Sequence, residues 1–364
     1  MVLAAIRPVA AEIEDASRVN VDQCASDPKR LGLSRIVEID TTGGVSIGGD
    51  QPGRTQFLKD GEVVLTFDDG PIKAYTRAVL KALADHCTKA TFFMVGRMAV
   101  ADPEMVREVA AAGHTIGSHT WSHKNLRPTV LLRAREEIET AISAISKING
   151  AAIAPLFRFP YLNANRQTEE YLKTRNIGTV WIDLDSKDYR TRDPRAVEQR
   201  IISQLVTLKK GIILMHDIQP STAKMLPGLL NELRDRGFKV VHMVAKAPVQ
   251  TIASFDAAAE KAIAAKAAAR AANPMATHSM VWTMAPTPAP AAASDAASPE
   301  AVPTAKQKGS TGAKKISTKP SIDEGAPQSN PQPPKAATSA TGKARKTAKP
   351  KDEDVPWQMN VLSN

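Results

Sequence analysis

The sequence has little cysteine, few aromatic residues and no long apolar run. Its two cysteines, Cys24 and Cys87, lie far apart and form no Cys-x-x-Cys pair, which excludes a zinc finger or a thioredoxin-like redox motif. No apolar run is long enough for a transmembrane helix, so we expect no membrane-spanning segment. In an oxidising compartment the two cysteines would pair, whereas two separate reduced thiols are the alternative.

The last part of the chain lacks the large apolar residues that a core needs. After Pro248 the sequence consists mostly of Ala, Pro, Ser, Thr and Lys. Such a segment cannot bury enough surface to offset the entropy lost on ordering. We therefore predict a linker at 248–274, with a solvated helix at 257–272 where Ala, Glu, Lys and Arg favour helix, and a disordered tail at 275–364.

Positive charge exceeds negative charge, and the formal net charge is +10. The lysines of the tail suit contact with an anionic polymer or surface, and a solubilising spacer is the alternative interpretation. These lysines are diffuse and lack interleaved aromatic residues. We therefore expect no specific nucleic-acid binding.

Residues 1–59 are predicted to form an N-terminal arm. Small residues around Ala10 resemble a signal cleavage site, but the apolar stretch before them is short and is interrupted by Arg7. This pattern is typical of the end of a signal peptide. It favours a periplasmic or secreted protein, with a cytoplasmic location as the alternative.

Residues 60–247 show the pattern of one globular domain, in which short apolar runs alternate with helical periodicity. Near-continuous apolar runs are typical of strands buried on both faces, as in parallel sheets. About seven such strands predict an α/β fold, specifically a distorted, incomplete (β/α) barrel. The predicted strands are 63–67, 90–95, 115–118, 156–159, 179–184, 212–215 and 239–243, and the predicted helices are 73–84, 103–113, 129–148, 194–208 and 221–236.

Titratable side chains follow five of the seven predicted strands. The carboxyl ends of parallel strands meet at one edge of a sheet, where α/β proteins carry their chemistry. Buried polar groups cost several kcal/mol unless they are partnered, so their convergence indicates a site. The residues concerned are Asp68, Asp69, His119, His123, Arg158, Tyr161, Asp185, Asp188, His216 and Asp217.

His119 and His123 lie four residues apart, a spacing that suits two ligands of one metal ion. Imidazole is the commonest ligand of zinc, and a carboxylate is the usual third ligand. We expect one divalent metal ion, zinc by default, although cobalt, manganese, nickel and iron suit the same ligands. A hydrogen-bonded histidine pair without metal is the alternative.

Asp68 and Asp69 end a predicted strand, so they point in different directions. One of them can bind a metal while the other acts as general base. His216, at the end of another strand, is the obvious acid, and a nearby Asp188 would keep it protonated. Arg158 would keep the base ionised.

Five motifs in order resemble those of the polysaccharide deacetylases, carbohydrate esterase family 4. They are T-F-D-D-G-P (66–71), H-T-W-S-H (119–123), R-F-P-Y (158–161), D-S-K-D-Y (185–189) and L-M-H-D (214–217). The resemblance covers roughly residues 60–245. It implies that this segment is a catalytic domain that removes acetyl groups from N-acetylglucosamine units.

The resemblance also implies roles for individual residues. It makes Asp68 the base and Asp69, with the two histidines, the metal ligands. Arg158 and Asp188 would tune the base and the acid His216, respectively.

Substrate-binding residues follow from the same motifs. The backbone N–H of Tyr161, next to Pro160, would bind the oxyanion, and Leu214 would form a wall of the acetate pocket. Two positions depart from the family pattern: Tyr189 stands where Trp is usual, and Leu162 stands where Gly is usual.

We therefore expect a metal-dependent hydrolase that N-deacetylates chitooligosaccharide, peptidoglycan or an exopolysaccharide and releases acetate. One alternative is an amidohydrolase that acts on a small non-sugar amide with the same residues. The other is a non-catalytic wall-binding protein that works through its basic tail.

Overall fold

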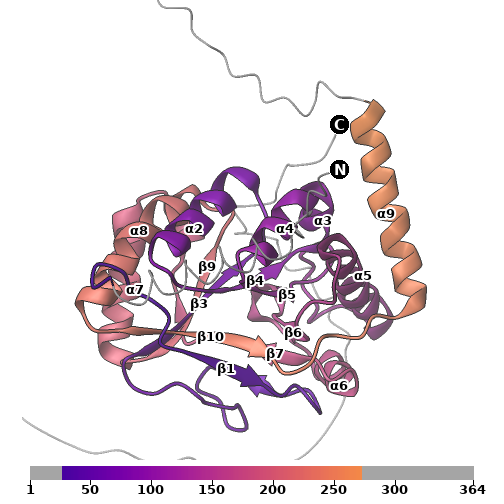
Figure 1. The fold of residues 1–364 in the computed structure, drawn as a ribbon. Helices are drawn as coiled ribbons and strands as arrows, with labels where there is room; N and C mark the ends of the chain where they lie inside the picture. Colours follow the sequence, from indigo (N-terminus) through magenta and orange to yellow (C-terminus); the bar gives the residue numbers. More distant parts are fainter. Residues whose placement is uncertain (1–26, 273–364) are drawn as a thin grey trace, which may run out of the picture. The chain divides into compact units, whose positions relative to one another are not determined.

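The computed structural model describes residues 27–272, which belong to the first of the chain's two units, Met1–Met284 (Figure 1). The predicted tail at 275–364 lies outside the described residues, as do the first 26 residues of the predicted arm. Within 27–272, no helix is both long and apolar enough to cross a membrane.

The described residues form one sheet of ten strands in which every pairing is parallel. The strands are β1 (Arg35–Ile39), β2 (Ser46–Ile47), β3 (Glu62–Asp68), β4 (Thr91–Met94), β5 (Thr115–Ser118), β6 (Leu156–Phe157), β7 (Gly178–Val180), β8 (Leu184–Asp185), β9 (Gly211–His216) and β10 (Lys239–Ala245).

The sheet curls into a barrel that does not close. From β3 it continues on one side through β4, β5, β6 and β7, and on the other side through β9 and β8. No pairing joins β7 to β8 within the part of the chain that the structure describes, and β2 pairs with β7 at this opening. The predicted α/β fold with an incomplete barrel is confirmed.

Helices alternate with the strands and cover the outside of the barrel (Figure 1). Asp102 and Asp193 cap two of them, α4 and α7, by accepting a backbone N–H, and a proline follows each cap. The helices are α2 (Lys73–Asp85), α3 (Gly96–Ala101), α4 (Pro103–Ala111), α5 (Leu131–Asn149), α6 (Arg166–Thr174), α7 (Pro194–Leu208), α8 (Pro220–Asp235) and α9 (Ala253–Ala272), with 3₁₀ turns η1 (Pro160–Leu162) and η2 (Asp188–Arg190).

Alternation along β3 separates two cores. Val63, Leu65 and Phe67 pack outward among the helices, whereas Val64 belongs to a smaller inner cluster. Since side chains alternate along a strand, Asp68 points inward with Val64. The carboxylate that ends β3 therefore enters the barrel at its carboxyl edge.

Two features of the sheet differ from the prediction. The predicted strand 179–184 is two strands, β7 and β8, because the Asp183 carboxylate accepts the backbone N–H groups of Gly49 (2.9 Å) and Ile212 (2.7 Å) between them. In addition, β1 and β2 come before residue 60. The folded part therefore begins earlier than the boundary that we predicted.

Two predictions concern segments at the margins of the fold. The helix expected at 257–272 is α9, which starts at Ala253 and is mostly exposed, although Ala259 is buried and Glu260 pairs with Lys147 of α5. Cys87 is disulfide-bonded. Cys24, the only other cysteine of the sequence, lies outside the described residues.

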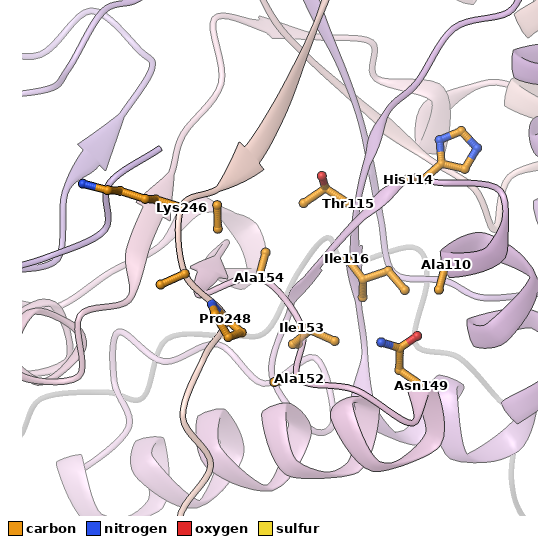
Figure 2. Close-up of a pocket in the computed structure, with 12 residues that line it drawn as sticks. Ala110, His114, Thr115, Ile116, Asn149, Ala152, Ile153, Ala154, Lys246 and Pro248 are labelled. Atoms are coloured by element: carbon orange, nitrogen blue, oxygen red, sulfur yellow. The ribbon is translucent and has the colours of Figure 1, made fainter. Parts of the chain in front are cut away.

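A cavity of about 340 Å³ opens between the start of β5, the loop before β6 and the segment after β10 (Figure 2). Thr115 and Ile116 line it at the amino end of β5, together with several alanines. The predicted site residue His119 follows the other end of this strand. The cavity is therefore separate from the predicted site.

Candidate active site and metal centre

The parallel register brings the predicted site residues to one edge of the barrel. Asp68 pairs with His216 across β3 and β9, and Ser118 at the end of β5 pairs with Phe157 of β6. His119 and Arg158 directly follow this second pair. The two predicted carboxylates, the histidines and the arginine thus meet at the carboxyl ends of neighbouring strands.

Asp69, His119 and His123 form a cluster whose ligand atoms all lie within 4.8 Å of one another, with Asp69 and His119 buried and His123 partly buried. Asp69 Oδ1 is 3.4 Å from His119 Nε2 and 3.2 Å from His123 Nε2. This carboxylate oxygen is buried and has no hydrogen-bond partner. A buried acceptor without a partner is costly unless a cation satisfies it, so a divalent metal ion fits this cluster.

The second nitrogen of His119 fixes the direction of the ring. His119 Nδ1 lies 2.7 Å from the carbonyl oxygen of Arg158, which can only accept a hydrogen bond, so Nδ1 carries the proton and Nε2 presents a lone pair to the cluster. Burial, followed by the charge of His123, holds the pKa of His119 well below its usual value. The ring is therefore neutral, which is the form that binds metal.

Backbone conformation at the cluster is unusual. Asp69 and His123 both have positive φ, 77° and 59°, a region that residues other than glycine rarely adopt. Such strain persists where surrounding structure enforces it, and it is concentrated at functional sites. Gly70 follows because a Cβ there would lie 2.2 Å from the Asp217 carboxylate.

Asp68 is held by the fully buried Arg158. Arg158 Nη1 donates to Asp68 Oδ1 (2.7 Å) and to Thr66 Oγ1 (2.8 Å), and its guanidinium lies 4.3 Å from the centre of the Phe93 ring. Burial raises the pKa of Asp68 to about 6, although the Arg158 charge opposes this rise. The carboxylate is therefore basic enough to take a proton near neutral pH.

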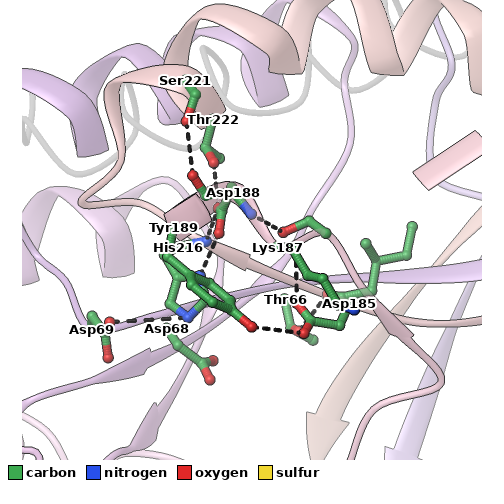
Figure 3. A network of polar contacts seen from close by, with 12 residues as sticks. Thr66, Asp68, Asp69, Asp185, Lys187, Asp188, Tyr189, His216, Ser221 and Thr222 are labelled. Atoms are coloured by element: carbon green, nitrogen blue, oxygen red, sulfur yellow. Dashed lines mark hydrogen bonds and ion pairs between the residues drawn. The ribbon is translucent and has the colours of Figure 1, made fainter. Parts of the chain in front are cut away.

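His216 is paired with Asp188 at the same edge (Figure 3). Its Nδ1 lies 2.7 Å from Asp188 Oδ1, and its backbone N–H donates to Asp188 Oδ2 (2.7 Å). Thr222 and Ser221 at the start of α8 also donate to Asp188. Burial alone would lower the pKa of His216, but the Asp188 charge and hydrogen bond outweigh burial and raise it to about 10.

The remaining predicted residues surround these groups. The Tyr189 ring lies edge-on to His216, 5.6 Å between centres, and its hydroxyl donates to Asp185 Oδ2 (3.1 Å). The Tyr161 ring lies 4.8 Å from that of His123 and is 49% exposed. Pro160 is buried beside it, and Leu214 shares the inward face of β9 with His216.

Sequence patterns did not assign three hydroxyl groups that support the site. Thr66 binds Arg158, Thr222 binds Asp188, and Thr76 donates to Asp217 (2.6 Å). Asp217 is buried, and burial raises its pKa to about 7. Threonine carries no sequence signal for such contacts, since each partner lies on another element.

Fold and site together define a class of protein: α/β proteins with an incomplete parallel barrel and an Asp-His-His cluster at its carboxyl edge. Residues 56–180 match the family model of polysaccharide deacetylase. A chitooligosaccharide deacetylase of Azorhizobium caulinodans is 36% identical over 160 residues, which cover 43% of this chain and 73% of that protein. The chain belongs to the polysaccharide deacetylase family.

Longer relatives and a solved structure are also similar. The peptidoglycan-N-acetylglucosamine deacetylase PgdA of Listeria monocytogenes is 30% identical over 179 residues, 49% of this chain, and the chain spans only 37% of that relative's length. The peptidoglycan deacetylase Bd3279 of Bdellovibrio bacteriovorus matches in structure with a TM-score of 0.55 and 30% identity, covering 65% of this chain and 70% of that one.

Proposed function

We propose that this protein is a metal-dependent N-deacetylase of glycans that contain N-acetylglucosamine, and that it releases acetate. The observation that carries the proposal is the buried Asp69 oxygen without a hydrogen bond, beside two imidazoles whose pKa burial lowers. His216 Nε2 lies 4.0 Å from the other oxygen of the same carboxylate. The names of the relatives support this substrate class, since they include peptidoglycan and chitooligosaccharide deacetylases.

Asp69, His119 and His123 would hold the metal ion. When bound, a divalent metal supplies a Lewis acid that polarises a carbonyl and makes water more acidic. Zinc is our proposed metal, because two imidazoles and one carboxylate with open positions suit it.

The protein's own groups move the protons. Asp68 accepts a proton from the attacking water, and Arg158 stabilises the ionised Asp68 carboxylate before this transfer. His216 donates its Nε2 proton to the departing nitrogen, and Asp188 holds the ring by its Nδ1–H. The backbone N–H of Tyr161 would donate to the developing oxyanion.

Three apolar or aromatic side chains complete the site in this proposal. Leu214 would form the wall against the acetyl methyl group, and Pro160 and Tyr189 would line the approach of the sugar. The proposed location is periplasmic or secreted, which the disulfide at Cys87 and the wall substrates named for relatives support.

Acetate release tests the proposal directly. Chitooligosaccharides of two to six sugars and peptidoglycan are incubated with protein treated with a chelator and with protein to which zinc is restored. We expect acetate only with metal, and faster release from longer oligosaccharides. No acetate from any glycan with metal restored would refute the function, while equal rates on a dimer and a hexamer would favour the small-amide alternative.

A further inference from the structure

The segments that follow strands β4, β5 and β8, including the first turn of α3, carry exposed cations that form no ion pair with any described residue. Among the residues that the structure describes, none of these side chains forms an ion pair. Asp193 on the same loops caps α7. We call the six cations the basic rim: Arg97, Lys124, Arg127, Lys187, Arg190 and Arg192.

On one side the basic rim is tied to the metal-ligand loop. Arg97 donates its backbone N–H to the carbonyl of Trp121, between the two histidine ligands (2.9 Å). Lys124 directly follows His123. Arg127 Nη1 donates to Oδ1 of Asn163 (3.3 Å), and Asn163 lies two residues after Tyr161. These cations therefore flank the proposed metal centre.

On the other side the basic rim reaches the proposed acid. The Arg190 guanidinium lies 5.8 Å from the Tyr189 ring centre, and that ring packs edge-on against His216. Lys187 lies on the same turn, where its backbone N–H binds Asp185 (2.8 Å; Figure 3). The cations thus stand on both sides of the buried site.

Three cations near the amino ends of strands form ion pairs, unlike those of the basic rim, although Lys239 at the start of β10 forms no ion pair with a described residue. Arg35 pairs with Glu62 and Lys210 pairs with Asp60. Arg234 pairs with Asp235 near that end. Partnered charges make a weak external field, whereas unpartnered charges of one sign around a concave site attract ligands of opposite charge.

We propose that the basic rim recognises carboxylate groups on the glycan, carried by sugars that flank the N-acetylated sugar. This inference rests on the proposed function and narrows its substrate class to an anionic glycan. The rim charges surround the reacting groups. The carboxylates that they bind therefore belong to the same molecule as the acetyl group that is removed. Lysine and arginine side chains suit this role because both bind carboxylates, and arginine does so in bidentate geometry.

The experiment compares two substrates that differ only in charge. One is a tetrasaccharide that alternates N-acetylglucosamine and N-acetylmuramic acid, whose lactyl groups are carboxylates, and the other is its methyl ester. Acetate release by the zinc-loaded full chain gives kcat/KM for each. At low salt we expect the acid to be favoured about 5- to 20-fold, and at about 0.5 M salt the preference should largely vanish because rim charges are screened.

Variants locate the effect on the basic rim. Arg97→Gln and Lys187→Gln should each reduce the acid-to-ester ratio about 2- to 4-fold and leave kcat/KM on the ester unchanged. Lys239→Gln is the matched control, since this exposed lysine lies at the amino end of β10 and should leave the ratio unchanged. The double variant should bring the ratio close to one.

Three results would overturn the inference. They are a ratio near one at low salt in the unmodified chain, an equal loss on both substrates in the variants, and rim-dependent binding to anionic lipid vesicles without any substrate preference. Equal acetate release from acid and ester would leave the deacetylase function standing, whereas no release from either would refute that function instead.

Discussion

Burial disfavours the charged form of the Asp68 side chain, and the neighbouring Arg158 favours it. The Asp68 carboxylate is buried and bonded to Arg158 at 2.7 Å. Replacing it by asparagine keeps the shape of the side chain and removes the proposed base. We expect Asp68→Asn to lower kcat about 10²- to 10⁴-fold with little change in metal content. Acetate assays and metal analysis check this, with Asp85→Asn on exposed α2 surface as the control.

Activity that stays within a factor of a few in Asp68→Asn would contradict the role of Asp68. A loss of metal along with activity would instead show that this side chain holds the ion.

The His216–Asp188 pair predicts a pH effect whose sign follows from the pKa. An acid must be protonated to act, and the pKa of His216 is raised to about 10, so the acid form persists well above neutral pH. In Asp188→Asn the raising charge is lost while burial, which lowers the pKa, remains. We therefore expect the alkaline limb of the kcat/KM profile to move to lower pH by at least about one unit.

Thr222→Val removes one hydrogen bond to Asp188 and keeps the charge. Because the charge that raises the pKa of His216 remains, its alkaline limb should stay close to that of the unmodified chain, which makes this variant the control. An unchanged limb in Asp188→Asn would show that His216 is not the group that titrates.

Residue identities at the site were predictable because the motifs concentrate them at strand ends. Backbone conformation was not. Leu162, where the family usually has Gly, has a φ of 53°, so the departure keeps the left-handed geometry despite its cost. The support from Thr66 and Thr222 was also unpredictable, because only the fold brings these threonines to their partners.

At the scale of elements, strong apolar periodicity predicted the central strands and most helices. The two-residue strands β2 and β8 have no periodicity to detect and exist only through pairing. Our interpretation of 129–148 as a helix with one apolar face also places Leu132 on that face with Ile138 and Ile142, and this is wrong, since Leu132 is 66% exposed. The first turn of α5 lies beyond the packed face, which starts at Ala134.

Arg35 of β1 joins the barrel through Glu62 at the start of β3, with two contacts of 2.8 and 2.7 Å. The Arg35 hydrogen bonds, against burial, lower the pKa of Glu62 to about 2 from 4.5. A depressed carboxyl pKa gives stability that is present above the unfolded value and is lost as pH falls through the folded one.

We expect Glu62→Gln to lower the free energy of unfolding by about 1.5–3 kcal/mol at pH 7, and by less at pH 3. Urea unfolding at both pH values measures this difference. Asp60→Asn breaks the exposed pair with Lys210 and should cost under about 1 kcal/mol. A Glu62→Gln cost that does not shrink at pH 3 would rule out the ionised pair as its source.

At the scale of the molecule, the proposed metal cluster joins two parts of the fold. Asp69 follows β3, and the two histidines follow β5, so one ion would cross-link loops far apart in the sequence. A ligand that binds only the folded state stabilises a protein by RT ln(1 + [L]/Kd), which is about 2.7 kcal/mol when the ligand concentration is 100 times Kd. The chelator-treated protein should therefore melt at a lower temperature than the zinc-loaded protein.

Thermal unfolding with graded zinc tests this expectation independently of activity. We expect the melting temperature to rise with zinc concentration in the unmodified chain and in Asp68→Asn, and not in His119→Ala, which lacks a ligand. His242→Ala is the matched control for removing a buried histidine, since His242 binds Thr115 at the other end of β5. Two remaining ligands cannot hold the ion as tightly as three. A melting temperature that still rises with zinc in His119→Ala would therefore show that the stabilising ion binds elsewhere.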